Sequence, residues 1–323
     1  MKVKVHGCRG SHPCATTPSR VTEISEFLWS YAKKNPNLSW EEAQKKLAQD
    51  TERSEYQIYS GNTTCIELTS DKSPLPIFID AGTGMNAASM DPDSCLQSEN
   101  FLSGRGEAAI FMTHTHYDHV LGLTTFPQLF MEKNQFYFYG VHKDLKKRVE
   151  GIFDPLYFPV PFSMIDPRLH FNTIEPGRSV RLGGVKVDHF PQSHPGGSFA
   201  YRFSDGVKTV VVATDTDLSN TDPPHLKPGD NIYSNAGLLI LDAHFSPEDF
   251  VNKEDYGHTH IHRAVDFAVR ENAKKALLFH QSPYYTDRQI WDQEVNARAY
   301  LKKQHPSSVM EIIMAHDGQT IQI

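Results

Sequence analysis

The residues best suited to chemistry stand in one short segment, Thr113-His114-Thr115-His116-Tyr117-Asp118-His119. It follows an apolar run, Ala109–Met112, which is typical of a buried strand. Four potential metal ligands within six residues are hard to place as core packing, because buried histidine and aspartate need polar partners and a metal ion supplies several at once. The first two histidines alternate and can point to one side of an extended segment. The segment therefore predicts a metal centre, against the competing interpretation of a solvated polar loop.

The types of ligand narrow the choice of metal ion. Imidazole nitrogens mixed with carboxylate oxygens suit zinc, with manganese and iron as the alternatives. The aspartate and the last histidine follow where the chain turns, so they can face a second divalent ion. Two such ions can activate water and polarise a phosphoryl or carbonyl oxygen together.

The composition limits the class of partner. The chain has 323 residues, 39% of them hydrophobic, a formal net charge of −7 and no long basic block, whereas a surface for extended nucleic acid normally shows a basic patch. No apolar run of about 18 residues predicts a membrane span, and the N-terminus lacks the apolar core of a secretory signal. The four cysteines form no CxxC pair, which favours reduced thiols and the cytoplasm.

The elements that must position the site alternate between strands and helices. Short apolar or alternating runs predict strands at Met1–His6, Thr64–Leu68, Ile77–Asp80, Ala108–Thr113, Gln135–Tyr139, Ser179–Phe190, Ser198–Phe203, Lys208–Ala213, Gly237–Leu241, Ala276–Phe279, Val309–Met314 and Thr320–Ile323. Helical spacing covers Leu121–Met131, His260–Asn272 and Gln289–Gln304. Strand-rich halves, each followed by helices, predict an α/β fold of two packed sheets with helices outside.

Two segments stand apart from this pattern. Val21–Asp50 has helical spacing and contains the capping box Ser39–Glu42, so we expect a helical insertion at about 20–55 that packs on the surface, forms a lid or meets a partner chain. Residues 151–167 are rich in proline and aromatic residues, which predicts a loop that covers a pocket or packs as a connection. We expect a single domain over residues 1–323 that contains both of these segments.

The histidine segment matches the HxHxDH signature of the metallo-β-lactamase superfamily. Gln192–Ser198, Ala213–Asp217 and Leu278–Gln281 resemble the further ligand segments of that family and follow in its order. The resemblance covers nearly the whole chain apart from the helical insertion. It implies a four-layer αββα sandwich of two mixed β-sheets with outer helices. Carried onto this sequence, it assigns one metal ion to His114, His116 and His194, the other to Asp118, His119 and His280, and the bridging position to Asp215.

Two of these assignments have competitors. His189 could take the place of His194, which we prefer because the Pro-Gly-Gly after it lets the backbone approach the metals. Asp217 could take the place of Asp215, which follows its strand more directly. Without the HxHxDH segment, either preferred residue alone would be interpreted as an ordinary polar residue.

Further segments resemble the phosphodiesterase branch of the superfamily, which contains ribonuclease Z and small cyclic phosphodiesterases. They are Gly7–Ser11, Ser60–Cys65 and Asp80–Gly84. In that branch Asp80 would orient metal ligands without binding metal itself. Asp287, shortly after the last histidine segment, is expected to cap the next helix.

Gly257–His260, together with Leu241–His244 before it, resembles the proton donor of that branch and the acidic residue that orients it. The resemblance assigns protonation of the leaving oxygen to His258 and its orientation to Asp242, with Asp118 as a further catalytic residue. Imidazole titrates near neutral pH and can protonate an alkoxide. The competing interpretation is that these histidines only begin a helix.

The leading hypothesis is a dinuclear metal-dependent phosphodiesterase in which a metal-bridging hydroxide attacks a small phosphodiester, with a 3′,5′-cyclic nucleotide as a candidate. A nuclease that processes the 3′ end of transfer RNA is one rival, although the long basic arm usual in ribonuclease Z is not found here. Hydrolysis of a carboxylic ester, thioester or lactone is a second rival, and a metal-bound sensor without turnover is a third. Tyr157 and Phe158 could stack on a ring, although packing is favoured. A homodimer is compatible with the branch.

Overall fold

Strand β4 (Glu107–Phe111) shows how the sequence builds the core. The computed structural model describes residues 1–218 and 231–323. Ala109 and Phe111 of β4 join the cluster between the two sheets, whereas Ala108 and Ile110 join the cluster under the outer helices. A strand that is covered on both faces carries apolar residues without alternation. The continuous apolar run before the histidine segment follows from this position.

Two seven-stranded mixed sheets contain the strands of the described residues. The first sheet has the order β14 (Thr320–Gln322), β1 (Lys2–Gly7), β2 (Cys65–Thr69), β3 (Ile77–Ile79), β4, β5 (Gln135–Gly140) and β6 (Leu169–Thr173). The second has the order β13 (Glu311–Met314), β12 (Lys275–Phe279), β11 (Leu238–Asp242), β10 (Thr209–Ala213), β9 (Ser198–Ser204), β8 (Val185–Gln192) and β7 (Val180–Leu182). β3 to β6 run parallel, as do β10 to β13, and the other neighbouring strands pair antiparallel.

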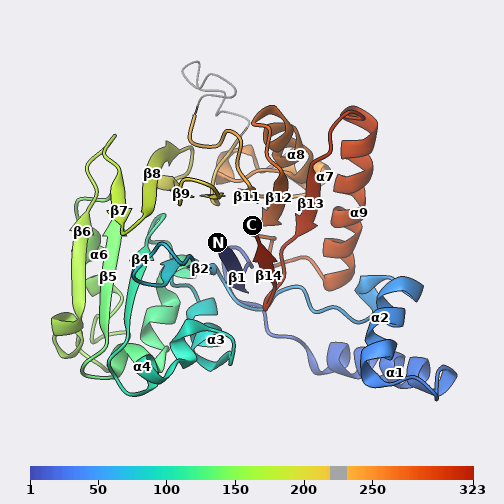
Figure 1. Cartoon of the computed structure of the whole chain (residues 1–323), viewed down its shortest axis with the longest axis horizontal. Helices are drawn as coiled ribbons and strands as arrows, with labels where there is room; N and C mark the ends of the chain where they lie inside the picture. Colours follow the sequence, from blue (N-terminus) through green and yellow to red (C-terminus); the bar gives the residue numbers. More distant parts are fainter. Residues whose placement is uncertain (219–230) are drawn as a thin grey trace.

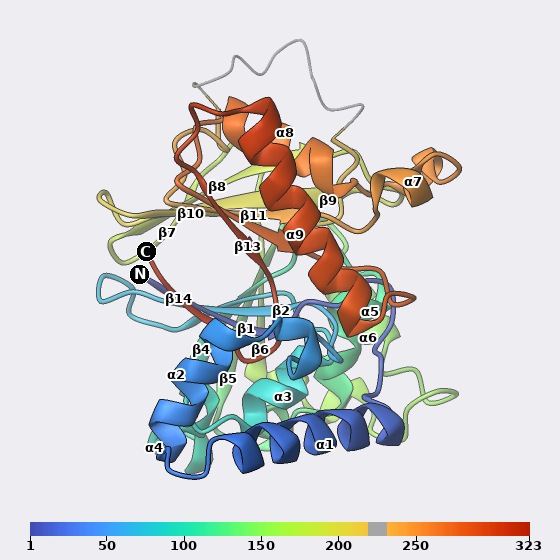
Figure 2. The same ribbon diagram turned by 90° about the vertical axis from the view of Figure 1, so that its right-hand side faces the viewer.

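The sheets pack face to face, and helices cover their outer faces (Figures 1 and 2). Val210 and Val212 of β10 point into the shared core, whereas Val211 faces the helices over the second sheet. The helices are α1 (Pro18–Lys34), α2 (Trp40–Asp50), α3 (Gly84–Met90), α4 (Glu99–Leu102), α5 (Tyr117–Val120), α6 (Leu145–Gly151), α7 (Pro247–Phe250), α8 (Ile261–Arg270) and α9 (Asp287–Gln304). The predicted α/β class with two packed mixed sheets and outer helices is confirmed.

The expected helical insertion forms α1 and α2, which project from one side of the sandwich (Figure 1). The capping box at Ser39 is present, and none of the residues of α1 is buried. Arg20 of α1 forms an ion pair with Asp287 at 3.0 Å, which ties the insertion to α9. Its role as a surface element, lid or partner contact stays a prediction. None of the helices in the two described ranges is long and apolar enough to cross a membrane.

Some expectations about local structure were wrong. Leu121–Met131 is not one helix but two 3₁₀ turns, η3 (Leu121–Thr124) and η4 (Pro127–Phe130), because proline in the interior of a helix removes a donor and clashes with the preceding turn. In the loop at residues 151–167, Phe153 and Phe162 pack into the core while Tyr157 is exposed. The loop is therefore anchored by a buried phenylalanine on each side of the exposed Tyr157. That it covers a pocket stays a prediction.

Candidate metal centre

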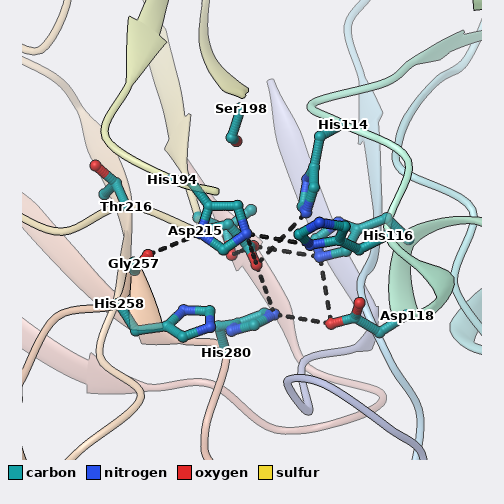
Figure 3. Close-up of polar contacts among 12 residues, drawn as sticks. His114, His116, Asp118, His194, Ser198, Asp215, Thr216, Gly257, His258 and His280 are labelled. Carbon is teal, nitrogen blue, oxygen red and sulfur yellow. Dashed lines mark hydrogen bonds and ion pairs between the residues drawn. The ribbon is translucent and has the colours of Figure 1, made fainter. Parts of the chain in front are cut away.

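The candidate ligands lie at the ends of four strands, where the chain leaves the sheets. The histidine segment follows β4, and the other ligand segments follow β8, β10 and β12. Because β4 belongs to one sheet and the other three strands to the second, the cluster bridges the two halves of the sandwich. Figure 3 shows these side chains converging on Asp215 from separate segments.

One group consists of three imidazoles, those of His114, His116 and His194, each with a ring nitrogen within 4.8 Å of the others. His194 Nε2 lies 3.2 Å from His116 Nδ1. His114 Nε2 is buried and has no hydrogen-bond partner. Leaving such an atom unpaired costs about 1–3 kcal/mol, and a cation bound between the three nitrogens would remove that cost.

The other group combines imidazoles and carboxylates of four buried residues: Asp118, His119, Asp215 and His280. His280 Nε2 lies 3.2 Å from Asp118 Oδ2 and 3.2 Å from Asp215 Oδ1. His119 Nε2 lies 3.2 Å from the other oxygen of Asp215, yet it forms no hydrogen bond. Asp215 thus presents Oδ2 toward His119 and Oδ1 toward His280. Oδ1 of Asp215 also lies 3.9 Å from His114 Nε2.

The charge states of these side chains suit divalent cations. Burial lowers the pKa of His114, His116 and His194, which keeps these imidazoles neutral and able to coordinate. Burial alone would raise the pKa of Asp118 and Asp215, but the neighbouring imidazoles outweigh it and lower both. His119 differs, because Asp215, Asp118 and Asp80 around it outweigh burial and raise its pKa. A divalent ion would replace its proton as the positive charge among these carboxylates, since neutral imidazoles and ionised carboxylates are the forms that bind metal. The donor set, with its orphaned ring nitrogens, therefore fits two divalent ions.

Asp80 supports the cluster from behind without entering it. Its Oδ2 accepts a hydrogen bond from His119 Nδ1 at 2.8 Å and another from the hydroxyl of Thr113 at 2.7 Å, and its Oδ1 accepts one from the Thr113 backbone at 2.8 Å. Because Nδ1 of His119 must carry the proton, its Nε2 presents a lone pair to the site.

The backbone is strained at several of these positions. Ser11, Asp80, Asp215 and His280 all have positive φ, between 57° and 64°. Non-glycine residues in this region cost on the order of 1 kcal/mol or more each, and such strain gathers at functional sites. Asp80, Asp215 and His280 directly follow, or nearly follow, the end of a strand. The left-handed conformation is therefore found where Asp215 and His280 enter the cluster and where Asp80 supports it.

His258 lies at the edge of the cluster, beside His280 (Figure 3). Its Nδ1 donates to Asp242 Oδ2 at 2.8 Å. Burial lowers the pKa of His258, but the carboxylates of Asp242, Asp215 and Asp118 together outweigh burial and the net pKa is raised. Asp242 also accepts hydrogen bonds from the backbone N–H groups of Asp215 and Thr259, both at 3.0 Å. This carboxylate therefore joins the predicted proton donor to the predicted bridging ligand.

A cavity of about 340 Å³ opens onto the cluster and is lined by Ser11, Thr115, His116, Tyr117, Asp118, Asp215 and His258. Ser11 donates its backbone N–H to Asp118 Oδ2 at 2.7 Å. A Cβ on the preceding Gly10 would lie 2.6 Å from the ring of His280 and 2.8 Å from the ring of His244. Only glycine lets the chain pass this close to both imidazoles.

The comparisons with known proteins agree with this arrangement. A family model described as "Beta-lactamase superfamily domain" matches residues 76–281, more than half of the chain. The chain belongs to this family. A comparison with curated proteins finds no matching sequence.

Several solved structures resemble this member of the beta-lactamase superfamily over its whole length. The metallo-beta-lactamase fold protein YhfI from Bacillus subtilis gives a TM-score of 0.63 at 17% identity, with 99% of this chain and 98% of that chain covered. Human tRNase Z, short form, gives 0.60 at 17%, with 100% and 99% covered. Unliganded yeast PDE1 gives 0.63 at 13%, with 100% and 99% covered. At these identities the likeness establishes the fold. Family membership and the donor set together indicate a metal-dependent hydrolase.

The structure of this superfamily member also separates the competing residues. His194 lies in the cluster, whereas His189 packs 6.2 Å from the ring of Phe199 and belongs to none of the clusters of potential ligands in the described residues. Asp215 lies in the cluster and Asp217 does not.

Two helices begin differently from expectation. The N-cap of α9 is Thr286 rather than Asp287. Asp287 is the first residue of the helix and accepts hydrogen bonds from Arg20 and from the backbone of Tyr59 instead. The competing interpretation of the GHTH segment holds for His260, which caps α8, but not for His258, which faces the cavity.

Sequence reasoning missed the contact of His244 with the site. This residue is 4% exposed, and its ring stacks on His258 with centroids 4.4 Å apart and planes 15° apart. The only signal in the sequence was its place two residues after Asp242 at the end of a strand, and that spacing does not reveal a contact with a loop 14 residues away.

Proposed function

We propose that the chain is a dinuclear metal-dependent phosphodiesterase that hydrolyses a small phosphodiester, with a 3′,5′-cyclic nucleotide as the first substrate to test. One observation carries the proposal: His258, whose Nδ1 lies 2.8 Å from Asp242 Oδ2, stands beside the candidate metal cluster and lines the same cavity. A hydrolase that releases an alkoxide needs a proton donor at this place.

The chain's own residues would divide the work. When bound, divalent ions supply a water molecule of lowered pKa and neutralise charge on a phosphoryl oxygen. His258 holds a proton on Nδ1 against Asp242, so that a second proton on Nε2 is available for the leaving oxygen. The raised pKa of His258 keeps this doubly protonated form populated nearer to neutral pH. Asp118 orients the cavity rim through its hydrogen bond from Ser11.

The size and charge of the molecule favour a small substrate. The cavity has a volume of about 340 Å³, at the lower end of the range of about 300–1,000 Å³ usual for small-molecule sites. The formal net charge of −7 disfavours a long polyanion. Zinc is the metal we propose, because imidazole nitrogens dominate the donor set.

The test is hydrolysis of bis-p-nitrophenyl phosphate and cyclic AMP by zinc- or manganese-loaded wild-type protein and by His258→Ala. We expect the variant to lose about a hundredfold or more in rate on cyclic AMP and much less on the p-nitrophenyl ester, whose leaving group needs no proton. Metal content must stay unchanged. A wild-type protein that cleaves neither phosphate would contradict the proposal, and so would a His258→Ala variant as active on cyclic AMP as the wild type.

A further inference from the structure

His244 is a buried histidine outside the two groups of candidate metal ligands proposed above, although one of its ring nitrogens lies within 4.8 Å of ring nitrogens of His258 and His280. It stands two residues after the end of β11 and is 4% exposed. Its backbone is fixed on both sides, because its N–H donates to Asp242 Oδ1 at 3.2 Å and its carbonyl accepts from the Ser282 N–H at 3.3 Å.

Its imidazole meets the ring of Phe245 edge-on, with centroids 4.5 Å apart, and it also contacts two residues of the site. Nδ1 of His244 lies 2.8 Å from the carbonyl oxygen of His280, and because a carbonyl can only accept, Nδ1 carries the proton. The ring lies nearly parallel to the ring of His258, with centroids 4.4 Å apart. The His258 and His280 rings are themselves stacked, at 5.0 Å and 25°. One side chain therefore contacts both the candidate metal ligand and the candidate proton donor.

We propose that His244 is a positioning residue that fixes His280 through a hydrogen bond and His258 through stacking. The half of this proposal that concerns His258 rests on the proposed function. The half of the proposal that concerns His280 does not, because it requires only that the cluster binds metal.

The hydrogen bond acts on a strained residue. His280 has a φ of 64°, a conformation that costs on the order of 1 kcal/mol or more for a residue with a side chain. A hydrogen bond from His244 to its carbonyl contributes about 0.5–1.5 kcal/mol and holds the peptide in this orientation. In that orientation His280 Nε2 lies 3.2 Å from both Asp118 and Asp215. Loss of the bond would let His280 turn away from its metal position.

The stacking acts on ring orientation. The hydrogen bond to Asp242 fixes Nδ1 of His258, but it leaves the ring free to tilt about that atom. Imidazole faces on His244 and His280 limit this tilt, and a third ring, that of His194, lies 5.2 Å from His258 at 58°. A small or non-aromatic side chain at position 244 would open one face and misdirect Nε2 of His258.

Two substitutions separate the two roles. His244→Asn keeps an N–H donor near the position of Nδ1 but removes the aromatic face, whereas His244→Phe keeps the face and removes the donor. His262→Asn is the matched control, because His262 is also stacked on an aromatic ring, that of Tyr300 at 3.9 Å, but lies outside the cavity lining.

Two readouts are needed. Zinc affinity, measured by competition with a chelating dye, reports on His280. The ratio of the rates on diphenyl phosphate and bis-p-nitrophenyl phosphate at metal saturation reports on His258, because the phenolate leaving group needs a proton more than p-nitrophenolate does. A thermal unfolding curve of each variant shows that it is folded.

We expect His244→Phe to lose about tenfold or more in zinc affinity with an unchanged rate ratio. We expect His244→Asn to keep its zinc affinity but to lose about tenfold more rate on diphenyl phosphate than on the p-nitrophenyl ester. Unchanged zinc affinity in both variants overturns the His280 half, and an unchanged ratio in His244→Asn overturns the His258 half. Equal losses in both readouts for both variants would indicate general packing and overturn the proposal. If the wild type cleaves neither ester, the His258 half fails with the proposed function, while the zinc affinities still decide the His280 half.

Discussion

Replacing Asp80 by asparagine should weaken the binding of one of the two candidate metal ions. The Asp80 carboxylate is fully buried and accepts three hydrogen bonds, two from Thr113 and one from His119 Nδ1, at 2.7–2.8 Å. Asparagine offers one acceptor oxygen and one NH₂ donor in the same space. If the oxygen stays opposite the Thr113 N–H, the NH₂ group faces His119 Nδ1.

That contact would reverse the tautomer of His119. Nδ1 would become the acceptor and Nε2 would carry the hydrogen, directed at Asp118 and Asp215, 3.4 and 3.2 Å away. A protonated Nε2 cannot coordinate metal. In the opposite amide orientation two N–H donors face each other, so a buried donor stays unpaired at a cost of about 1–3 kcal/mol. Since about 1.4 kcal/mol corresponds to a factor of ten, we expect a loss of affinity of roughly 10- to 100-fold, the range usual for such supporting residues.

The assay is a zinc titration of metal-free Asp80→Asn against a chelating dye, with the bound stoichiometry checked by elemental analysis. We expect the ion at Asp118, His119 and His280 to weaken and the ion at the other three histidines to stay. Thr113→Val is the matched control for the ion at Asp118, His119 and His280, because it removes the hydroxyl, which also lies 3.1 Å from His114 Nδ1, and leaves the carboxylate on His119. Two ions bound with wild-type affinity in Asp80→Asn would refute the reasoning.

Three further predictions follow from single contacts. Gly10→Ala should lower zinc affinity by about tenfold or more, because its Cβ would meet the His280 ring at 2.6 Å; unchanged affinity in a zinc titration would contradict this. In Asp242→Asn the pKa of His258, which the carboxylate raises, should fall. Because a charged hydrogen bond contributes about 1.5–3 kcal/mol, the loss of kcat with rising pH should begin about 1–2 pH units lower than in the wild type. An unchanged pH profile would show that Asp242 does not set this pKa. Glu67→Gln should lower the free energy of unfolding by about 1–3 kcal/mol at pH 7. Hydrogen bonds hold the pKa of Glu67 below its usual value despite burial, so the stabilisation from its carboxylate is present above the unfolded pKa and is lost as pH falls. In urea unfolding, the difference in free energy of unfolding between wild type and variant should therefore narrow below about pH 4.5. A difference that does not change with pH would exclude the ionised carboxylate as its source.

The parts of the fold that sequence predicted best are those decided by local pattern. The apolar run before His114 had to be a strand covered on both faces, and it is. Several short elements were not predicted, β6 and α3 among them, because tertiary contacts decide them. β6 (Leu169–Thr173) is an edge strand with polar residues between its apolar ones. α3 (Gly84–Met90) has only seven residues and includes a glycine, an asparagine and a serine, and it packs on β1.

The candidate site likewise contains some residues that a local pattern predicts and others that it does not. The HxHxDH segment points to metal by itself, because four ligands lie within six residues. His194, Asp215 and His280 are isolated in the sequence and could be assigned only through the resemblance to the metallo-β-lactamase superfamily. Supporting contacts such as the stack of His244 on His258 join the end of one strand to a distant loop, and no local pattern encodes such a pair.

The central claim is that the site hydrolyses phosphodiesters. Its most direct test is a comparison of kcat/KM for one metal-loaded preparation of the wild-type protein on bis-p-nitrophenyl phosphate, a p-nitrophenyl carboxylic ester, an acyl thioester and a lactone. We predict that the phosphodiester is the preferred substrate and that removal of metal by a chelator abolishes its cleavage. Preferred cleavage of the thioester or lactone, with the phosphodiester left intact, would contradict the claim and leave only the metal-dependent hydrolase.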